Sequence, residues 1–156
     1  MVEPSSSADG LGRQVYRIAQ WAPAHDPGTR WEYSNANYYV LGALIERVSG
    51  RDYAGYIQAE ILEPIGMAHS FVADGESHDS IAVGHTPWFG MKRPVKQTAT
   101  HRMSAPVGGI IASAGDMARY LAMMMNGEDD IISAASKAEM MRPASDVSPF
   151  YGFGWY

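Results

Sequence analysis

The residue types most suited to chemistry stand together at Tyr33-Ser34-Asn35, between a Pro-Gly turn at residues 27–28 and an apolar helical pattern from Ala36. A phenol and a side-chain amide two residues apart could transfer a proton and hold a polar group of a ligand. The same residues fit a plain structural explanation, in which Tyr33 is an aromatic residue beside a helix start and Asn35 is the N-cap. On these residues alone, the structural explanation is favoured.

Proton transfer by Tyr33 would require a large shift of its pKa. A free tyrosine titrates near pH 10, and lowering its pKa by about three units takes roughly 4 kcal/mol of differential stabilisation, normally from nearby cations. The chain has only three lysines, Lys92, Lys96 and Lys137, and none stands three residues after a serine. We therefore expect Tyr33 to stay a neutral phenol in this chain alone.

Composition indicates one folded domain and argues against several classes of function. The chain has 156 residues, of which 46% are hydrophobic and 19% charged, as in an ordinary globular protein. A net charge of −5 with scattered signs argues against nucleic-acid binding. The absence of cysteine excludes disulfides, cysteine-ligated zinc and thiol nucleophiles.

Targeting signals are not recognisable in the sequence. Residues 1–10 are polar and lack the apolar core of a secretory signal. No apolar run approaches the roughly 20 residues that a membrane-spanning helix needs, so we expect no membrane span. The compartment is not predicted.

Helical spacing of apolar residues predicts a mainly α fold with short strands. We expect a disordered lead-in over residues 1–10, followed by a single, incomplete domain segment over residues 11–156. Asp52, Ser113 and Ser133 are the expected N-caps of helices that begin at residues 53, 114 and 134. Gly50 is the expected left-handed end of a helix over residues 36–49. Helices are predicted over residues 11–21, 36–49, 53–62, 114–126 and 134–141.

The remaining segments carry weaker signals. Residues 68–107 are expected to be mostly loop, with minor strands at 71–72 and 81–83. The alternation of aromatic residues and glycine over residues 151–156 predicts the start of a strand. Met123-Met124-Met125 is interpreted as core filler with a partly exposed flank. For Trp31, Trp88 and Trp155, packing is favoured over a pocket-lining role.

In its order of motifs, the stretch from about residue 20 to 156 resembles the serine β-lactamase and penicillin-binding-protein superfamily. The likeness is to its class C β-lactamase, D-Ala-D-Ala carboxypeptidase and esterase branch. Tyr33-Ser34-Asn35 is similar to the second active-site motif of that family. Further similar stretches are residues 63–67 (a Glu-Pro-Leu-Gly-Met-like turn), 106–109 (its Gly-Gly loop), 113–118 (the next helix start) and 151–155 (the stretch before its third motif).

The resemblance implies acyl transfer, in which a serine attacks an amide, ester or β-lactam carbonyl and water later hydrolyses the acyl-enzyme. By this likeness Tyr33 would take the serine proton and return it to the leaving group, and Asn35 would bind the substrate carbonyl. The family's nucleophile lies in a Ser-x-x-Lys motif that this sequence lacks. We therefore expect a segment of a serine hydrolase that is inactive alone.

The implied fold is the helical region of the serine β-lactamase/D,D-peptidase fold, lacking most of the antiparallel sheet. The implied ligand of the complete protein is a small acyl substrate (a β-lactam, an ester or a D-Ala peptide), with no cofactor and no metal. Apolar surface that would face the missing sheet is expected to be exposed, and to be covered by a second copy or a complementing segment.

Alternative functions remain open at this point. A non-catalytic helical module could use the inherited pocket to bind a ligand, or could associate with itself. A metal-dependent hydrolase is disfavoured, because the five histidines show no paired helical spacing. No Gly-x-Ser-x-Gly elbow occurs, which excludes an α/β-hydrolase.

Two other candidate motifs are disfavoured. His85-Thr86-Pro87 is similar to a His-Thr-Gly third motif, but Pro87 replaces the flexible glycine and the motif precedes the Gly-Gly loop instead of following it. Ser113 has no histidine or lysine close in sequence to activate it, and its spacing to Asp116 suits an N-cap.

Overall fold

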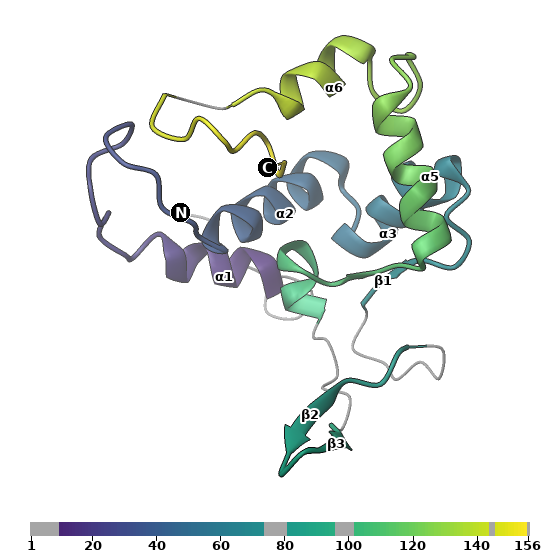
Figure 1. Ribbon diagram of the computed structural model, residues 1–156. Helices are drawn as coiled ribbons and strands as arrows, with labels where there is room; N and C mark the ends of the chain where they lie inside the picture. Colours follow the sequence, from purple (N-terminus) through teal and green to yellow (C-terminus); the bar gives the residue numbers. More distant parts are fainter. Residues whose placement is uncertain (1–9, 74–80, 96–101, 144–145, 156) are drawn as a thin grey trace.

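The computed structural model describes residues 10–73, 81–95, 102–143 and 146–155. Within these ranges the chain is mainly helical, which confirms the expected fold class (Figure 1). The helical elements are α1 (Gly10–Ile18), α2 (Ala36–Ser49), α3 (Tyr53–Ile57), the π-helix η1 (Gln58–Leu62), α4 (Glu63–Ile65), the 3₁₀ helix η2 (Arg102–Val107), α5 (Ala114–Met125) and α6 (Ala134–Met141). Gly10, expected in the lead-in, begins α1; the rest of that lead-in lies outside the described residues.

Two small antiparallel strand pairs accompany the helices. β1 (Phe71–Val72), predicted as a minor strand, pairs with β4 (Ile110–Ile111). β2 (His85–Trp88) and β3 (Met91–Pro94) form a hairpin that projects away from the helices in Figure 1. The described part of the chain holds no larger sheet.

Helix α2 is the element around which α1, α3 and η2 pack. It spans the predicted residues, and Gly50 ends it in the left-handed conformation, with φ 69° and an N–H that donates to the Glu46 carbonyl. Gly42 faces η2 so closely that a Cβ at this position would overlap the ring of Pro106. A glycine at position 42 therefore permits the close contact between α2 and η2.

The hydrophobic core lies beside α2 rather than around it. Ile57, Leu62, Met67, Val72 and Ala105 are buried together, from the α3–η1–α4 segment, β1 and η2. This cluster joins the α3–η1–α4 segment to β1 and η2, and it leaves part of α2 uncovered.

One face of α2 exposes apolar side chains at helical spacing. These are Val40, Leu41, Leu44 and Val48, which we call the α2 stripe; Val48 is 78% exposed. Exposed apolar surface is expected from the sequence, and the α2 stripe is such a surface.

Three of the expected N-caps are confirmed. The side chains of Asp52, Ser113 and Ser133 accept hydrogen bonds from backbone N–H groups three residues later. These bonds begin α3, α5 and α6 at the predicted residues.

The expected cap by Asn35 is wrong. Asn35 has helical dihedrals, φ −60° and ψ −22°, and its side chain makes no capping bond. A capping side chain needs an extended backbone to turn back to the free N–H groups. Ser34 Oγ instead accepts the N–H of Ala36 at 3.2 Å.

Two helix ends differ from the prediction. α1 ends at Ile18, and residues 19–21 form turns instead of a further helical turn. The third helix continues past the predicted end at Leu62 and through Pro64, until Gly66 ends it with φ 76°. The wider π turn of η1 comes directly before this proline, which has no N–H to donate.

The strand predictions at 81–83 and over residues 151–155 are wrong, and the last residue of the second prediction, Tyr156, lies outside the described residues. Residues 81–84 form no strand, and the hairpin begins at His85. In the described residues 151–155, the Gly152 N–H donates to the Trp155 carbonyl at 2.8 Å, and the Phe153 N–H donates to the Met140 carbonyl at 2.8 Å. The segment forms a turn against the end of α6, because its backbone donors find partners there instead of on a neighbouring strand.

Candidate functional site

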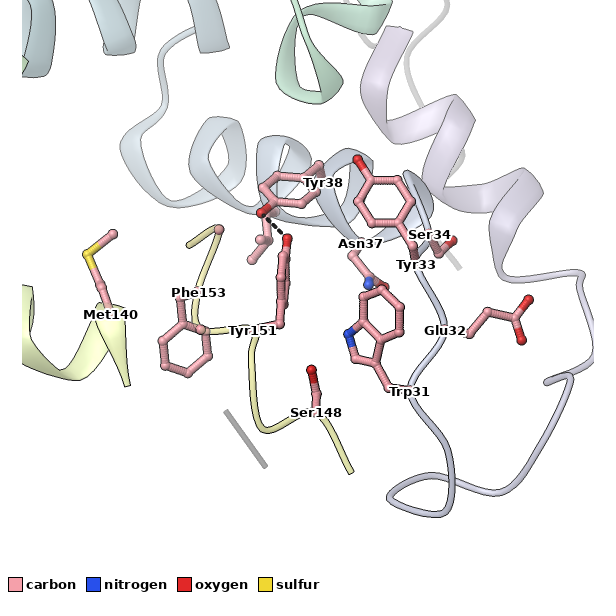
Figure 2. Close-up of a pocket in the computed structure, with 13 residues that line it drawn as sticks. Trp31, Glu32, Tyr33, Ser34, Asn37, Tyr38, Met140, Ser148, Tyr151 and Phe153 are labelled. Carbon is pink, nitrogen blue, oxygen red and sulfur yellow. Dashed lines mark hydrogen bonds between the residues drawn. The ribbon is translucent and has the colours of Figure 1, made fainter. Parts of the chain in front are cut away.

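Tyr33 lines a pocket of about 440 Å³ between the loop that precedes α2 and the segment that follows α6 (Figure 2). We call it the Tyr33 pocket. The α2 side contributes residues 31–34, Asn37, Tyr38 and Leu41. The other side contributes Met140, Ser148 and residues 151–154. The pocket therefore brings together segments more than 100 residues apart in the sequence.

Close backbone contacts shape the second wall of the pocket, and the Trp31 ring joins it to the first. In this second wall, formed by Met140, Ser148 and residues 151–154, the Phe153 N–H donates to the Met140 carbonyl. This wall also requires a glycine at position 152, because a Cβ there would overlap the Met140 carbonyl oxygen and lie 3.0 Å from the Arg142 carbonyl oxygen. The ring of Trp31 packs against Phe150 and Tyr151, with centroid distances of 5.7 and 5.8 Å. Trp31 thus joins the walls and also lines the pocket, a role for which the sequence analysis preferred packing alone.

A pair of tyrosines spans the pocket. The hydroxyls of Tyr38 and Tyr151 lie 3.4 Å apart and point toward one another in Figure 2. The hydrogen bond to Tyr38, together with burial, raises the pKa of Tyr151 above its ordinary value. Tyr151 is therefore a neutral hydrogen-bonding group at the pocket wall and not a base.

Tyr33 is accessible from the pocket and from solvent. Its side chain is 56% exposed. It also lines an adjoining pocket of about 360 Å³, formed with residues 105–108 and Ile110. No lysine or arginine is among the described residues that line either pocket. The neutral state of Tyr33 stays a prediction.

Asn35 lies apart from the pocket-lining residues. Its side chain is exposed, lines neither pocket and forms no hydrogen bond with a described residue, whereas Asn37 does line the Tyr33 pocket. The structure thus brings Tyr33 together with Ser34 and Asn37. The substrate-binding role of Asn35 stays a prediction.

The sequence analysis did not identify the C-terminal wall. Ser148 is buried, and its Oγ has no hydrogen-bond partner among the described residues. Phe153 and Tyr151 add aromatic surface to the same wall. Tyr151 and Phe153 lie in the aromatic–glycine alternation that predicts a strand and in the stretch similar to the one before the family's third motif, whereas Ser148 carries no sequence signal.

The other candidate residues lie elsewhere. His85, Thr86 and Pro87 are exposed in β2 and line neither pocket, and Ser113 caps α5. In residues 10–73, 81–95, 102–143 and 146–155, no three or more histidine, aspartate and glutamate side chains are placed to bind a metal ion. His78 and His101 fall outside these ranges. None of the described helices has the length and apolar character required to cross a membrane.

The remaining aromatic and methionine expectations can be checked directly. Trp155 stacks on Tyr120, with ring centroids 6.2 Å apart, and Trp88 is exposed on the hairpin. Met124 is buried while Met125 is 76% exposed, which confirms the interpretation of the methionine run as core filler with an exposed flank.

A protein-family model described as "Beta-lactamase" matches residues 4–156. The "Putative penicillin-binding protein PbpX" of Bacillus subtilis (strain 168) is 34% identical over 131 residues, which are 83% of this chain and 32% of that protein. This chain therefore spans about a third of the length of that relative.

Solved structures give the same picture of the fold. The octameric penicillin-binding protein homologue from Pyrococcus abyssi matches with a TM-score of 0.69 and 26% identity, over 94% of this chain and 39% of that chain. The penicillin binding protein from Bacillus halodurans matches with a TM-score of 0.74 and 23% identity, over 92% of this chain and 45% of that chain. The described helices thus correspond to less than half of either fold.

Proposed function

Since the chain belongs to the beta-lactamase family of serine hydrolases, we propose that it carries the Tyr-x-Asn part of an acyl-transfer site. This sequence contains no Ser-x-x-Lys motif. The nucleophilic serine of the site would therefore come from a segment outside this sequence that carries that motif. The observation that supports the proposal best is the place of Tyr33, at the junction of two pockets that a small acyl compound can enter.

In the proposed reaction, Tyr33 accepts the proton of the attacking serine and returns it to the leaving group. A lone phenol is a weak base at neutral pH. No lysine or arginine among the described residues lines the two pockets, so the missing segment must also bring a cation beside Tyr33. The lysine of a Ser-x-x-Lys motif would be that cation.

Asn35 is proposed to bind the carbonyl group of the substrate. Its side chain is exposed and is not used as a helix cap, so its amide N–H groups are available to a ligand. This role also requires the complete site, because Asn35 does not line the Tyr33 pocket of this chain.

The proposed substrates are a β-lactam, an ester or a D-Ala peptide. The relatives named as penicillin-binding proteins make a penicillin the first compound to test. The pocket walls support an apolar or aromatic group next to the reacting carbonyl, since Trp31, Tyr151 and Phe153 line them.

The second candidate function is a non-catalytic module that binds itself or a complementing segment. The exposed α2 stripe favours it, because apolar surface at helical spacing is normally covered in a stable protein. The octameric relative from Pyrococcus abyssi shows that self-association occurs in the family.

Intact mass spectrometry after incubation with a penicillin, and separately with a fluorophosphonate, tests the proposal. We expect no covalent adduct on this chain alone, provided that circular dichroism shows it to be folded. A stoichiometric adduct would demonstrate a nucleophile within the chain and overturn the proposal.

The contribution of Tyr33 is tested after the chain is supplied with the Ser-x-x-Lys segment of a family member. Acylation by the penicillin should then appear, and Tyr33→Phe should slow it about 100-fold or more, as expected for loss of general acid–base catalysis. Tyr16→Phe is the matched control, because Tyr16 is similarly exposed on α1, outside both pockets. Equal acylation rates for Tyr33→Phe and wild type would show that Tyr33 does not take part in the reaction.

A further inference from the structure

The β2–β3 hairpin carries an exposed apolar tip that the proposed acyl-transfer site does not use. All residues of β2 and β3 are exposed. The tip consists of Trp88, Phe89, Gly90 and Met91, and Phe89 is 88% exposed. Trp88 and Phe89 contact each other edge-to-face at 5.1 Å. Their rings therefore form one aromatic cluster at the turn of the hairpin, and Figure 1 shows this hairpin projecting away from the helices.

The backbone at the tip is unfavourable for a phenylalanine. Phe89 has φ 46° and Gly90 has φ 79°, so both turn residues are left-handed. A two-residue hairpin turn of this kind prefers Asn-Gly, and a bulky residue at positive φ costs on the order of 1 kcal/mol or more. Folding alone does not explain a phenylalanine at position 89, since asparagine would form the turn more easily.

Basic side chains follow directly behind the apolar tip. Lys92 and Arg93 are exposed, and neither forms an ion pair with a described residue. Trp88 lies opposite Met91, and Thr86 lies opposite Arg93. Because residues two apart in a strand share a face, the Arg93 side chain lies on the same face of the hairpin as Trp88 and Met91, two residues farther from the tip than Met91. The side chains at the tip are thus apolar, and the cationic side chains of Lys92 and Arg93 lie farther from the tip.

The charge of this region differs from that of the rest of the chain. Residues 81–115 contain no aspartate or glutamate, and all 17 acidic residues lie outside this range. The chain as a whole carries a net charge of −5. An anionic surface would therefore attract the hairpin and repel the other parts of the molecule, which would orient the tip toward that surface.

We propose that the hairpin tip inserts into the surface of an anionic lipid membrane. Trp88, Phe89 and Met91 would enter the interfacial region, and Lys92 and Arg93 would lie at the lipid phosphates. A protein partner fits less well, because stable protein interfaces bury about 800 Å² on each side, over roughly 20 residues or more, whereas the tip has four residues.

Vesicle co-sedimentation tests the proposal with the full chain. The protein should bind vesicles of phosphatidylcholine mixed with phosphatidylglycerol, and not vesicles of phosphatidylcholine alone, and added salt should weaken the binding. Phe89→Asn should weaken it about tenfold or more without lowering the melting temperature, since Asn-Gly suits this turn. The double variant Lys92→Gln/Arg93→Gln should weaken it roughly 30-fold.

The matched control removes an equivalent pair from another surface. Trp21→Ser/Arg17→Gln deletes an exposed tryptophan and a basic residue at the end of α1, and should bind like wild type. Brominated acyl chains should quench part of the tryptophan emission, and Trp88→Phe should remove that quenching while keeping the binding.

Equal binding by Phe89→Asn and wild type, or equal binding to both kinds of vesicle, would overturn the proposal. Absence of vesicle binding would also overturn it. If in that case the chain self-associates and Phe89→Asn abolishes the association, the tip instead docks on a second copy of the chain.

Discussion

Asp116 is a fully buried carboxylate that ties the loop after α4 to helix α5. It accepts the backbone N–H of His69 at 2.7 Å and the hydroxyl of Ser70 at 2.8 Å, and its other oxygen accepts from Arg119 at 2.8 Å. Burial by itself raises the pKa of Asp116, but the hydrogen bonds from Ser70 and His69, helped by the charges of His69 and Arg119, hold it below the ordinary value.

The lowered pKa predicts a specific dependence of stability on pH. Because the folded state favours the ionised carboxylate, this contribution is fully present above the unfolded-state pKa of about 3.9 and is lost as the pH falls through the lower folded-state value. Asp116→Asn should lower the melting temperature at neutral pH by roughly 5 °C or more, since the amide nitrogen cannot accept a hydrogen bond and leaves a donor of this buried group without its acceptor. The gap between variant and wild type should narrow in acid.

Thermal unfolding followed by circular dichroism across this pH range is the measurement. Asp146→Asn is the control, because Asp146 is exposed and should behave like wild type at every pH. If the difference in melting temperature between Asp116→Asn and wild type stays constant as the pH falls, the charge of Asp116 does not contribute to stability.

At the same scale, the sequence identified only part of the candidate site. Tyr33 was found because its motif is local and lies directly before a strong helix pattern. Tyr151 is not predictable as a site residue, because its contact in the pocket is with Tyr38, 113 positions away, and Ser148 lies in no local motif. Asn35 was assigned as a cap from its residue type, but capping depends on a backbone conformation that residue type does not fix.

At the scale of elements, the packing of α2 against η2 depends on the missing side chain of Gly42. Alanine favours a helix by about 1 kcal/mol over glycine. At position 42, however, its Cβ would lie 2.9 Å from Pro106 Cβ and overlap Pro106 Cγ. We expect Gly42→Ala to destabilise the fold by about 1–3 kcal/mol, as overpacking does.

Gly115→Ala gives the matched comparison on α5. A Cβ there meets nothing nearer than 3.9 Å, so this change should be neutral or slightly stabilising. Urea unfolding of both variants provides the measurement. If both variants raise the midpoint, helix propensity and not packing controls these positions.

Helices α5 and α6 are joined by a buried lysine. Lys137 is 2% exposed, and its Nζ donates to the carbonyls of Met123 and Glu128 and to the side chains of Asn126 and Asp130, at 2.7–2.9 Å. Its three N–H groups thus hold the C-terminal end of α5 and the following loop. The hydrogen bond from Lys137 to Asp130 is the main reason that the pKa of Asp130 lies below its ordinary value.

Lys137→Met keeps the length of the side chain and removes its donors and charge. The carbonyl groups and Asp130 would lose their partner, so we expect a loss of about 3 kcal/mol of unfolding free energy in urea titrations. Lys92→Met, on the exposed hairpin, should leave stability unchanged. Similar midpoints for the two variants would mean that water replaces the Lys137 contacts at little cost.

The elements were predictable where their cause is local. Helices α2, α5 and α6 follow from apolar spacing with Ser or Gly at their ends, and these boundaries agree within one residue. The hairpin was missed because its strands contain Pro87, Lys92, Arg93 and Pro94, which are untypical of strands and show no alternation. The expected strand after residue 150 depends on a partner strand, which the sequence of this segment does not reveal.

At the scale of the whole molecule, the α2 stripe bears on whether copies of the chain associate in solution. Leu44 is 53% exposed within a stripe of four apolar residues. Apolar surface of this kind drives association, because covering it removes it from water. We therefore expect the chain to self-associate, with an average mass in light scattering that rises with protein concentration.

Leu44→Glu should shift this association to at least tenfold higher concentration, since it places a charge in the middle of the covered surface. Tyr16→Ser, which removes an exposed aromatic side chain from α1, should not. A chain that stays monomeric at every concentration would contradict the expectation.

The two proposals for what covers the α2 stripe can be separated by competition. If the stripe receives the segment that carries the Ser-x-x-Lys motif, adding that segment should return the assembly to single copies of the chain and create the site acylated by penicillin at the same time. Leu44→Glu should then weaken both effects together, because one surface serves both partners. If the segment restores acylation while the assembly stays intact, copies of the chain meet through another surface, and the α2 stripe belongs to the catalytic fold alone.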